Sequence, residues 1–471
     1  MMTDIVYALL GGVSVFFIAY LLIYATFLFI SVAVGAFKLY KRDRMTRFRN
    51  ELKHGFYMPI TIVVPAYNEE VTIVDSVKTF LTLDYRLFEV VVVDDGSKDD
   101  TAAELIKAYN LSLTHRPVRR VLKCQPATEV YEAQIGKVKL TLIRKVNGGK
   151  GDALNMGINA SQYPYFICVD ADSMLQRDSL EKIAQPVMED DTVVAVGGLI
   201  RVAQCVTFDE DGKVSTYRLP KNLIVCMQVM EYDRSFMASR ILLDLFNGNL
   251  IVSGAFGLFK KSTVIAAGGY NPATLGEDMD LIVRLHVYCR NSREKYAIRY
   301  EPNAVCWSQA PTSLGDLGKQ RRRWNLGLFQ CMINYRQLFS NLRFGMVSFV
   351  SYMYYLFYEL LSPFIEVFGI LTVIISSIFG LLNTSFMLQF FILYTVYGAV
   401  LSITAFYQRI YTQNLRVSPS DLVKALLMCI LEIGFFRYFI SFIRVASFFT
   451  YKKRKGQWGS IKRVKHDGSK T

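Results

Sequence analysis

Histidine is scarce in this chain, and its cysteines are not spaced as metal ligands. The 471 residues include only four His and eight Cys, and no two cysteines form a CxxC pair. A metal site built from His or from Cys and His is therefore not expected. Cys168 and Cys429 lie within apolar runs, so we interpret the cysteines as reduced core residues.

Charge is absent from two long stretches of the sequence. No residue is charged between Asp4 and Lys38, and none is charged from Val367 to Gln408. The whole chain has 54 Lys and Arg against 40 Asp and Glu, a net charge of +14, and its mean hydropathy is +0.25. This composition excludes a purely soluble or disordered chain and predicts an integral membrane protein. No nucleic-acid-binding motif accompanies the basic excess, so no nucleic acid is expected as a partner.

The N-terminal apolar run (1–37) is long enough for one tilted span or two short ones. Six Lys and Arg follow between residues 38 and 49 and indicate the cytoplasmic side. A signal peptide is disfavoured because the run is too long, lacks a basic start and shows no small-residue cleavage site. We expect a multi-pass protein of the plasma membrane.

The C-terminal third (344–450) predicts three or four crossing or re-entrant segments, followed by a basic tail (451–471). Ionisable residues inside a span are costly and usually face a cavity or a partner. Glu359, Glu366, Glu432 and Arg437 therefore either line a polar path through the bilayer or form ion pairs that lock helices together. The sequence favours neither interpretation.

The middle of the chain (58–310) carries most of the polar residues. Short apolar runs alternate there with helical patterns, which indicates βαβ units and an α/β domain with a mostly parallel sheet. The predicted strands are Ile60–Val64, Phe88–Val93, Leu140–Arg144 and Phe166–Val169. The predicted helices are Val71–Leu81, Ala102–Tyr109 and Gly151–Ala160.

Polar segments accompany all four predicted strands. They are Pro65–Glu69, Asp94–Ser97, Asn147–Asp152 and Asp170–Asp172. Ligands of open α/β sheets bind at the carboxyl ends of the strands. Four such segments at one edge are more than solubility requires, so this edge is the expected ligand site.

The residue types at this edge suit a nucleotide and a divalent cation. Asp170 and Asp172 are hard oxygen ligands that suit Mg²⁺ or Mn²⁺ bound also to phosphate oxygens. Lys150 lies in a glycine-flanked loop and suits a diphosphate. Asp94 and Tyr67 have groups that hydrogen-bond to and stack on a nucleobase. A lone DxD is common in loops, so the prediction depends on the whole set.

Two further clusters follow. Gly276–Asp280 precedes an apolar run, where its carboxylates either cap a helix or act in chemistry. Gln320–Trp324 lies in a basic amphipathic stretch (311–343), which is typical of helices at a membrane surface. Both structural interpretations leave Asp278 available as a base and Arg323 as an anion clamp.

As a set, PAYNEE, VDDGS, NGGKGDALN, DAD, GED and QRRRW resemble the motifs of family-2 glycosyltransferases. The resemblance covers about residues 61–324 and is to the processive, membrane-embedded branch of that family, which includes cellulose, hyaluronan, chitin and poly-N-acetylglucosamine synthases. It implies a GT-A nucleotide-diphosphosugar transferase domain that faces the cytoplasm and packs on a transmembrane pore.

On the donor side, the resemblance implies that Tyr67 and Asp94 contact uracil and that Lys150 contacts the diphosphate. It also implies that Asp170 contacts the nucleotide and that Asp172 ligates the metal ion. Mg²⁺ or Mn²⁺ is the implied cofactor, and a UDP-sugar is the implied donor.

On the acceptor side, the resemblance implies that Asp278 is the general base, with Glu277 of the same motif at the substrate. The remaining implied contacts are Gln320 and Arg323 with the donor diphosphate, Trp324 with the acceptor sugar, and Ser253 and Gly254 with the acceptor-side loop. A glycine-kinked core strand is an equally good interpretation of the segment Val252–Phe256.

Two departures from the branch are visible. No further domain follows the last apolar segment, so a cyclic-di-GMP receptor is not expected in this chain. Accessory subunits are possible partners. Residues 203–218 resemble a hairpin insertion without an assigned role.

The resemblance implies a processive, inverting synthase that adds hexose from a UDP-sugar to a growing polysaccharide and secretes the polymer through its own channel. β-Glucan from UDP-glucose is placed marginally ahead of poly-GlcNAc from UDP-GlcNAc. A non-processive transferase acting on a polyprenyl phosphate is the alternative, although such enzymes typically lack QxxRW. An export channel with a dead transferase site is disfavoured because all the motif acids are present.

Overall fold

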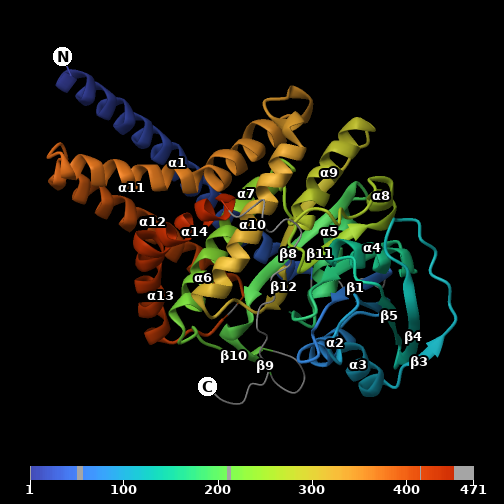
Figure 1. The fold of residues 1–471 in the computed structure, drawn as a ribbon. Helices are drawn as coiled ribbons and strands as arrows, with labels where there is room; N and C mark the ends of the chain where they lie inside the picture. Colours follow the sequence, from blue (N-terminus) through green and yellow to red (C-terminus); the bar gives the residue numbers. More distant parts are fainter. Residues whose placement is uncertain (1, 50–56, 209–213, 414, 450–471) are drawn as a thin grey trace.

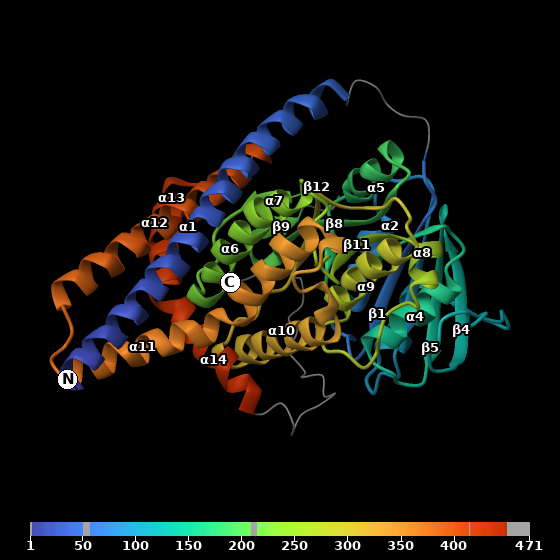
Figure 2. The same cartoon turned by 90° about the horizontal axis from the view of Figure 1, so that it is seen from above.

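The computed structural model describes residues 2–49, 57–208, 214–413 and 415–449. The predicted basic tail (451–471) lies outside the described residues, as does the turn of the predicted hairpin. Figures 1 and 2 show two parts, a sheet-containing domain and a group of long helices that extend away from it.

The sheet-containing domain is built on one mixed ten-stranded sheet. Its strand order is β3-β4-β5-β2-β1-β6-β11-β8-β12-β7. Strands β5, β2, β1 and β6 are parallel neighbours, whereas β11 runs antiparallel to both β6 and β8. The strands are β1 (Ile60–Ala66), β2 (Phe88–Asp94), β3 (Ser112–Thr114), β4 (Ala127–Ile135), β5 (Val138–Lys145), β6 (Tyr165–Val169), β7 (Met174–Leu175), β8 (Val193–Val202), β11 (Phe256–Lys260) and β12 (Ala297–Ser308).

Helices connect these strands and precede the membrane part. They are α2 (Ile73–Leu81), α3 (Thr101–Tyr109), α4 (Lys150–Ala160), α5 (Ser179–Glu189), α6 (Leu223–Arg234), the π-helical segment η2 (Ser235–Ser239), α7 (Arg240–Asp244), α8 (Lys261–Ala266), α9 (Glu277–Asn291) and α10 (Leu314–Asn334). Every residue of β2 is buried, as expected for a continuous apolar strand covered on both faces. The four predicted strands and three predicted helices are all present, each within two residues of its predicted ends.

The antiparallel part of the sheet was not predicted. Strands β3 and β4 extend the sheet beyond β5 in antiparallel register, and β7 pairs antiparallel with β12. The predicted hairpin insertion is present as β9 (Val206–Phe208) and β10 (Val214–Tyr217), which pair antiparallel in a small separate sheet.

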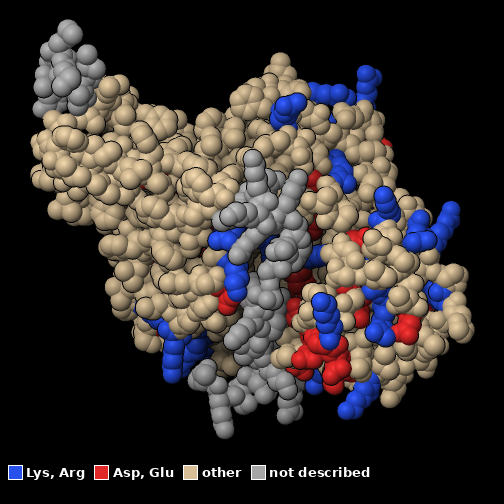
Figure 3. Space-filling view, in the orientation of Figure 1, with Lys and Arg blue, Asp and Glu red and all other residues tan. Residues whose placement is uncertain are grey.

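Within the described residues, three helices are long and apolar enough to cross a membrane, over Ala8–Lys41, Thr384–Thr412 and Pro419–Phe449. Val347–Leu360 and Ser362–Ile378 form a pair bent by 43° that gives a fourth candidate if the two count as one span. The N-terminal run is therefore one helix, α1 (Met2–Arg49), rather than two short spans. The half of the surface formed by these helices shows almost no charged side chains (Figure 3).

The C-terminal segments are the π-helical η5 (Val347–Tyr352) and η6 (Tyr355–Leu360), then α11 (Ser362–Ile378), α12 (Thr384–Thr412), α13 (Pro419–Leu431), the π-helical η7 (Glu432–Phe436) and α14 (Arg437–Phe449). Helices α1, α11 and α12 project together away from the sheet in both views (Figures 1 and 2). Of the candidate spans, Pro419–Phe449 is the most buried within the protein. Its burial is consistent with a segment that lines the interior rather than the lipid-facing surface.

Candidate active site

One cavity of about 2340 Å³ joins the sheet to the long helices. Its first part, here called the donor arm, is lined by the polar ends of the strands and by α9 and α10. Its second part, the membrane arm, is lined by side chains of α1, η6, α11, η7 and α14. The cavity brings together these predicted site residues: Tyr67, Lys150, Asp170, Asp172, Ser253, Gly254, Glu277, Asp278, Gln320, Arg323 and Trp324.

Lys150 lies between two carboxylates at the N-terminus of α4. Its Nζ is 2.6 Å from Oδ1 of Asp170 and 3.4 Å from Oε1 of Glu277. Burial opposes the charge on Lys150, but these two carboxylates outweigh it and raise its pKa above the ordinary value. Burial also raises the pKa of Glu277. A protonated Lys150 at this edge suits the diphosphate of a nucleotide.

The carboxylates of the DAD segment fit a divalent cation shared with a ligand. Asp172 is buried, lines the cavity and follows the end of β6 together with Asp170. The described residues contain no group of three or more His, Cys, Asp or Glu that could hold a metal ion alone. Mg²⁺ is usually bound through one or two carboxylates plus substrate phosphates. The donor set therefore fits Mg²⁺ or Mn²⁺ held together with a diphosphate.

Asp94 is the one predicted site residue that does not line the cavity. It is buried, its Oδ1 accepts a hydrogen bond of 3.0 Å from Ser97 N, and its Oδ2 is 3.7 Å from Arg144 Nε. Its neighbour Asp95 lines the cavity instead. Asp94 is the last residue of β2 and Asp95 follows the end of the strand, a distinction that the DDG motif alone does not reveal.

Asp95 belongs to a buried ionic cluster that sequence reasoning missed. It pairs with Lys145, which also lies 2.7 Å from Asp152. Asp95 also accepts hydrogen bonds from the backbone N–H of Gly148 (3.0 Å) and Gly149 (2.7 Å). The cluster shapes the glycine loop that presents Lys150. Asp95 follows β2, Lys145 ends the neighbouring β5 and Asp152 lies in the first turn of α4; opposite charges at the ends of the two strands were a signal available in the sequence.

Asp278 lies in the first turn of α9, close to the loop before β11. Its Oδ2 accepts from Gly254 N at 3.3 Å, and its Oδ1 accepts from Met279 N at 2.8 Å. A Cβ on Gly254 would come within 3.1 Å of Lys150 Nζ. Residues 252–255 lie outside any strand, with a turn at 254–255, and β11 begins at Phe256, so the core-strand interpretation is wrong for residues 252–255. The N-cap of α9 is Gly276 and no side chain caps it, so Asp278 is an acidic residue of the first turn, where it suits the helix dipole, and it also lines the cavity.

Two glycines bring α9 and α10 together. A Cβ on Gly327 would lie 2.7 Å from Gly276 N, and a Cβ on Gly276 would lie 3.1 Å from Gly327 Cα. Gln330 of α10 accepts a hydrogen bond of 2.9 Å from Leu275 N. This close approach places the QRRRW motif beside Asp278. Trp324 is 42% exposed, and its ring lines the cavity.

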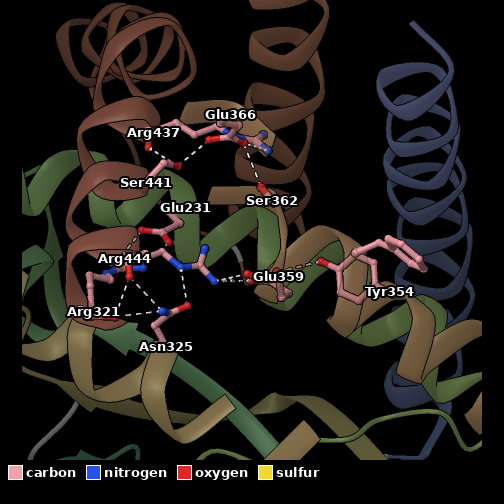
Figure 4. A network of polar contacts seen from close by, with 12 residues as sticks. Glu231, Arg321, Asn325, Tyr354, Glu359, Ser362, Glu366, Arg437, Ser441 and Arg444 are labelled. Carbon is pink, nitrogen blue, oxygen red and sulfur yellow. Dashed lines mark hydrogen bonds and ion pairs between the residues drawn. The ribbon is translucent and has the colours of Figure 1, made fainter. Parts of the chain in front are cut away.

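The membrane arm is walled by ion pairs between helices (Figure 4). Arg437 contacts Glu366 at 2.7 Å, and Arg234 contacts Glu432 at 2.5 Å. Glu359 lies 3.6 Å from Arg444 and accepts from the Tyr354 hydroxyl at 3.1 Å. All four ionisable residues singled out in the spans line the cavity, and all are paired. The interpretation as ion pairs that lock helices together is therefore confirmed, whereas the polar path through the bilayer stays a prediction.

Aromatic rings complete the membrane arm. Tyr358 stacks against Tyr24 of α1 with ring centroids 5.0 Å apart, and Phe27 stacks against Tyr354 at 4.5 Å. Arg437 lies 5.0 Å from the centroid of the Tyr24 ring. Rings and neutralised ion pairs together form a polar wall of low net charge.

Comparison with known proteins agrees with this geometry. A family model described as "Glycosyltransferase like family 2" matches residues 58–327. The poly-beta-1,6-N-acetyl-D-glucosamine synthase of Staphylococcus aureus (strain COL) is 30% identical over 331 residues, 69% of this chain and 68% of the relative. The synthase of the same name from Staphylococcus epidermidis is 28% identical over 315 residues, 65% of this chain and 64% of the relative.

A solved structure shares the fold. The mannosyltransferase PcManGT from Pyrobaculum calidifontis, in complex with GDP-Man and Mn²⁺, aligns with a TM-score of 0.50 and 18% identity. The alignment covers 88% of this chain and 99% of that chain. With the sequence matches, it confirms a GT-A fold flanked by apolar helices. The chain is a membrane-bound enzyme that belongs to family 2 of the glycosyltransferases.

Proposed function

We propose that this protein is a processive, inverting polysaccharide synthase that extends a β-linked N-acetylglucosamine polymer from UDP-GlcNAc. The observation that carries the proposal is the single cavity of about 2340 Å³ that runs from the DAD, GED and QRRRW residues to the membrane helices. A polar chain cannot cross hydrocarbon unaided. A continuous cavity that starts at the transfer site and carries polar groups along its wall gives such a chain an exit.

The chain's own residues account for the transfer step. A hydroxyl at the non-reducing end of the polymer attacks C1 of the donor sugar, and the bond from C1 to the diphosphate oxygen breaks. Asp278 accepts the hydroxyl proton, a role that requires an ionised carboxylate within hydrogen-bond reach. Lys150, Gln320 and Arg323 hold the diphosphate and stabilise the charge that develops on leaving UDP.

Asp172, with Asp170 nearby, would hold the divalent cation. A bound Mg²⁺ or Mn²⁺ would supply additional positive charge at the leaving diphosphate. For the nucleobase we propose Tyr67 together with Asp95, because Asp95 faces the cavity where Asp94 does not. Ser253, Gly254 and Trp324 lie on the acceptor side of Asp278.

The choice of sugar rests on the relatives. Two similar proteins are poly-beta-1,6-N-acetyl-D-glucosamine synthases by name, which favours GlcNAc over the glucose that the sequence placed first. A β-1,6 linkage is proposed on the same ground. The catalytic domain faces the cytoplasm in this proposal, because that is where the UDP-sugar is made and where the basic residues in the last part of α1 (38–49) belong.

Purified protein in lipid nanodiscs tests the proposal. We expect UDP release from UDP-GlcNAc with Mg²⁺ or Mn²⁺, weaker release from UDP-glucose, and a product of many sugars on a gel. Loss of release on chelation, with recovery on adding the ion, tests the cation. A product consisting only of mono-glycosylated lipid would refute processivity, and faster turnover of UDP-glucose would refute the choice of sugar.

A further inference from the structure

The last turn of α6 faces the QRRRW motif across the cavity. Glu231 receives two hydrogen bonds from the guanidinium of Arg321, a short one from NH1 and one of 2.6 Å from NH2. Such bidentate pairs fix the plane of the guanidinium as well as its position. The Arg321 side chain is 8% exposed, and that of Glu231 is 28% exposed.

The same guanidinium packs on the ring of Trp324. Arg321 Cζ is 4.8 Å from the ring centroid, a cation–π distance. The ring of Tyr232, next to Glu231, lies 6.5 Å from that of Trp324. Trp324 thus packs against these two neighbours and remains 42% exposed. Glu231, Tyr232, Arg321 and Trp324 all line the cavity.

The turn that carries Glu231 is itself anchored to the membrane helices. Asp233 accepts from Arg409 of α12 at 3.0 Å, and Arg234 makes two hydrogen bonds of 2.5 and 2.9 Å to Glu432 of η7. Glu231 therefore lies in a helical turn that is held by one ion pair to α12 and another to η7. A carboxylate held in this way can fix Arg321, and Arg321 in turn can fix the ring.

We infer that Glu231 is a positioning residue for the acceptor: through Arg321 it holds the Trp324 ring in the orientation that stacks on the terminal sugar. The inference rests on the proposed function, because it takes Trp324 as the acceptor platform. Glu231 is 90 residues from Arg321 in the chain and outside every motif, so the sequence alone did not single it out.

Glu231→Gln tests the inference, because it keeps the size of the side chain and removes the charge. We expect the KM for a GlcNAc-oligosaccharide acceptor to rise roughly tenfold, as for loss of one charge-assisted contact, and the product to shorten. The KM for UDP-GlcNAc and the affinity for UDP should stay within about twofold, which also shows that the variant is folded. Asp84→Asn, which breaks the Asp84–Arg177 pair outside the cavity, is the matched control and should leave the acceptor KM unchanged. An acceptor KM equal to wild type in Glu231→Gln overturns the inference.

A double-variant cycle separates positioning from a general structural role. If Glu231 acts through Arg321, then Glu231→Gln should add nothing to the acceptor KM in an Arg321→Met background. The emission of Trp324, taken as the difference between each protein and its Trp324→Phe counterpart, should change in Glu231→Gln and in Arg321→Met alike. Full additivity of the two variants, or an unchanged Trp324 emission in Glu231→Gln, overturns the inference.

The same experiment distinguishes failure of the inference from failure of the proposed function. If wild-type protein makes only mono-glycosylated lipid, processivity is refuted, and the KM for the lipid acceptor then replaces that for the oligosaccharide. A roughly tenfold rise in that KM in Glu231→Gln still supports positioning of the ring. An unchanged KM overturns it.

Discussion

The donor arm and the membrane arm of the cavity present charge in opposite ways. In the donor arm, Lys150, Asp170 and Asp278 are held by short chain segments at strand ends and helix starts. In the membrane arm, each ionisable side chain is matched by a partner on another helix, as in Glu366–Arg437. The donor arm thus shares one lysine between two carboxylates and has further acids beside them, a set that a cation and a diphosphate would complete, whereas the membrane arm pairs its charges one to one. This difference suits a phosphate-bearing donor at one end and a neutral polymer at the other.

Removal of the proposed base tests the difference between the two arms with the largest expected effect on turnover. Asp278→Asn should lower turnover by about 10³-fold, within the range for loss of a general base, while UDP affinity stays near wild type because the amide keeps the contact with Gly254. UDP release and UDP titration measure the two effects. Asp191→Asn, an exposed carboxylate outside the cavity, should behave as wild type. Retention of half the activity in Asp278→Asn would mean that the base is another residue.

Removing the cation of the donor arm should have the next largest effect. Lys150→Met should lower turnover by about 10²-fold, because it removes one clamp on the leaving diphosphate, and should weaken UDP binding as well. The loss also removes the positive charge that opposes the effect of burial on Glu277, so the pKa of that carboxyl should rise further. Lys182→Met, in an exposed pair with Asp178, is the control. Unchanged UDP affinity in Lys150→Met would contradict the diphosphate role.

The membrane arm should respond in stability more than in donor chemistry. Glu366→Gln leaves the partly buried Arg437 without its acid and should cost about 2 kcal/mol of unfolding free energy, seen as a lower melting temperature. The double variant Glu366→Gln/Arg437→Met should recover part of that loss. UDP affinity should not change in either variant, because neither residue reaches the donor arm. A loss of UDP affinity as large as in Lys150→Met would erase the distinction between the arms.

The two arms also differ in how much of them the sequence predicts. The donor arm comes from motifs whose residues are close in the chain and follow strands with a clear apolar pattern, so its elements and most of its residues were predicted. The membrane arm depends on pairs such as Arg234–Glu432, which are 198 positions apart, and no periodicity signals which partners meet. Asp94 and Asp95 show the remaining limit: only Asp95 lines the cavity, and the exact end of the strand, which separates the two residues, is not legible in the sequence.

His286 of α9 is a further residue whose role no pattern indicates. It is fully buried. Its Nε2 lies 3.0 Å from the carbonyl oxygen of Asn249, which can only accept, so Nε2 carries the proton and Nδ1 accepts from the Tyr296 hydroxyl at 2.8 Å. The neutral ring thereby ties α9, which carries Asp278, to the segment that leads to Gly254. Burial lowers the pKa of His286 to about 4.

This histidine predicts an acid sensitivity located in α9, behind the donor arm, the smallest of the expected effects. Folded His286 stays neutral down to about pH 4, whereas the unfolded chain takes up the proton near pH 6.5. Between these values the unfolded state binds the extra proton, so unfolding becomes easier as the pH falls, by about 1 kcal/mol from pH 7 to about pH 5.5. In His286→Gln this share of the fall in melting temperature should disappear, because glutamine does not titrate, whereas His115→Gln, at an exposed histidine, should keep the wild-type fall. If the melting temperature of His286→Gln falls with pH as in wild type, then a group other than His286 causes the acid sensitivity.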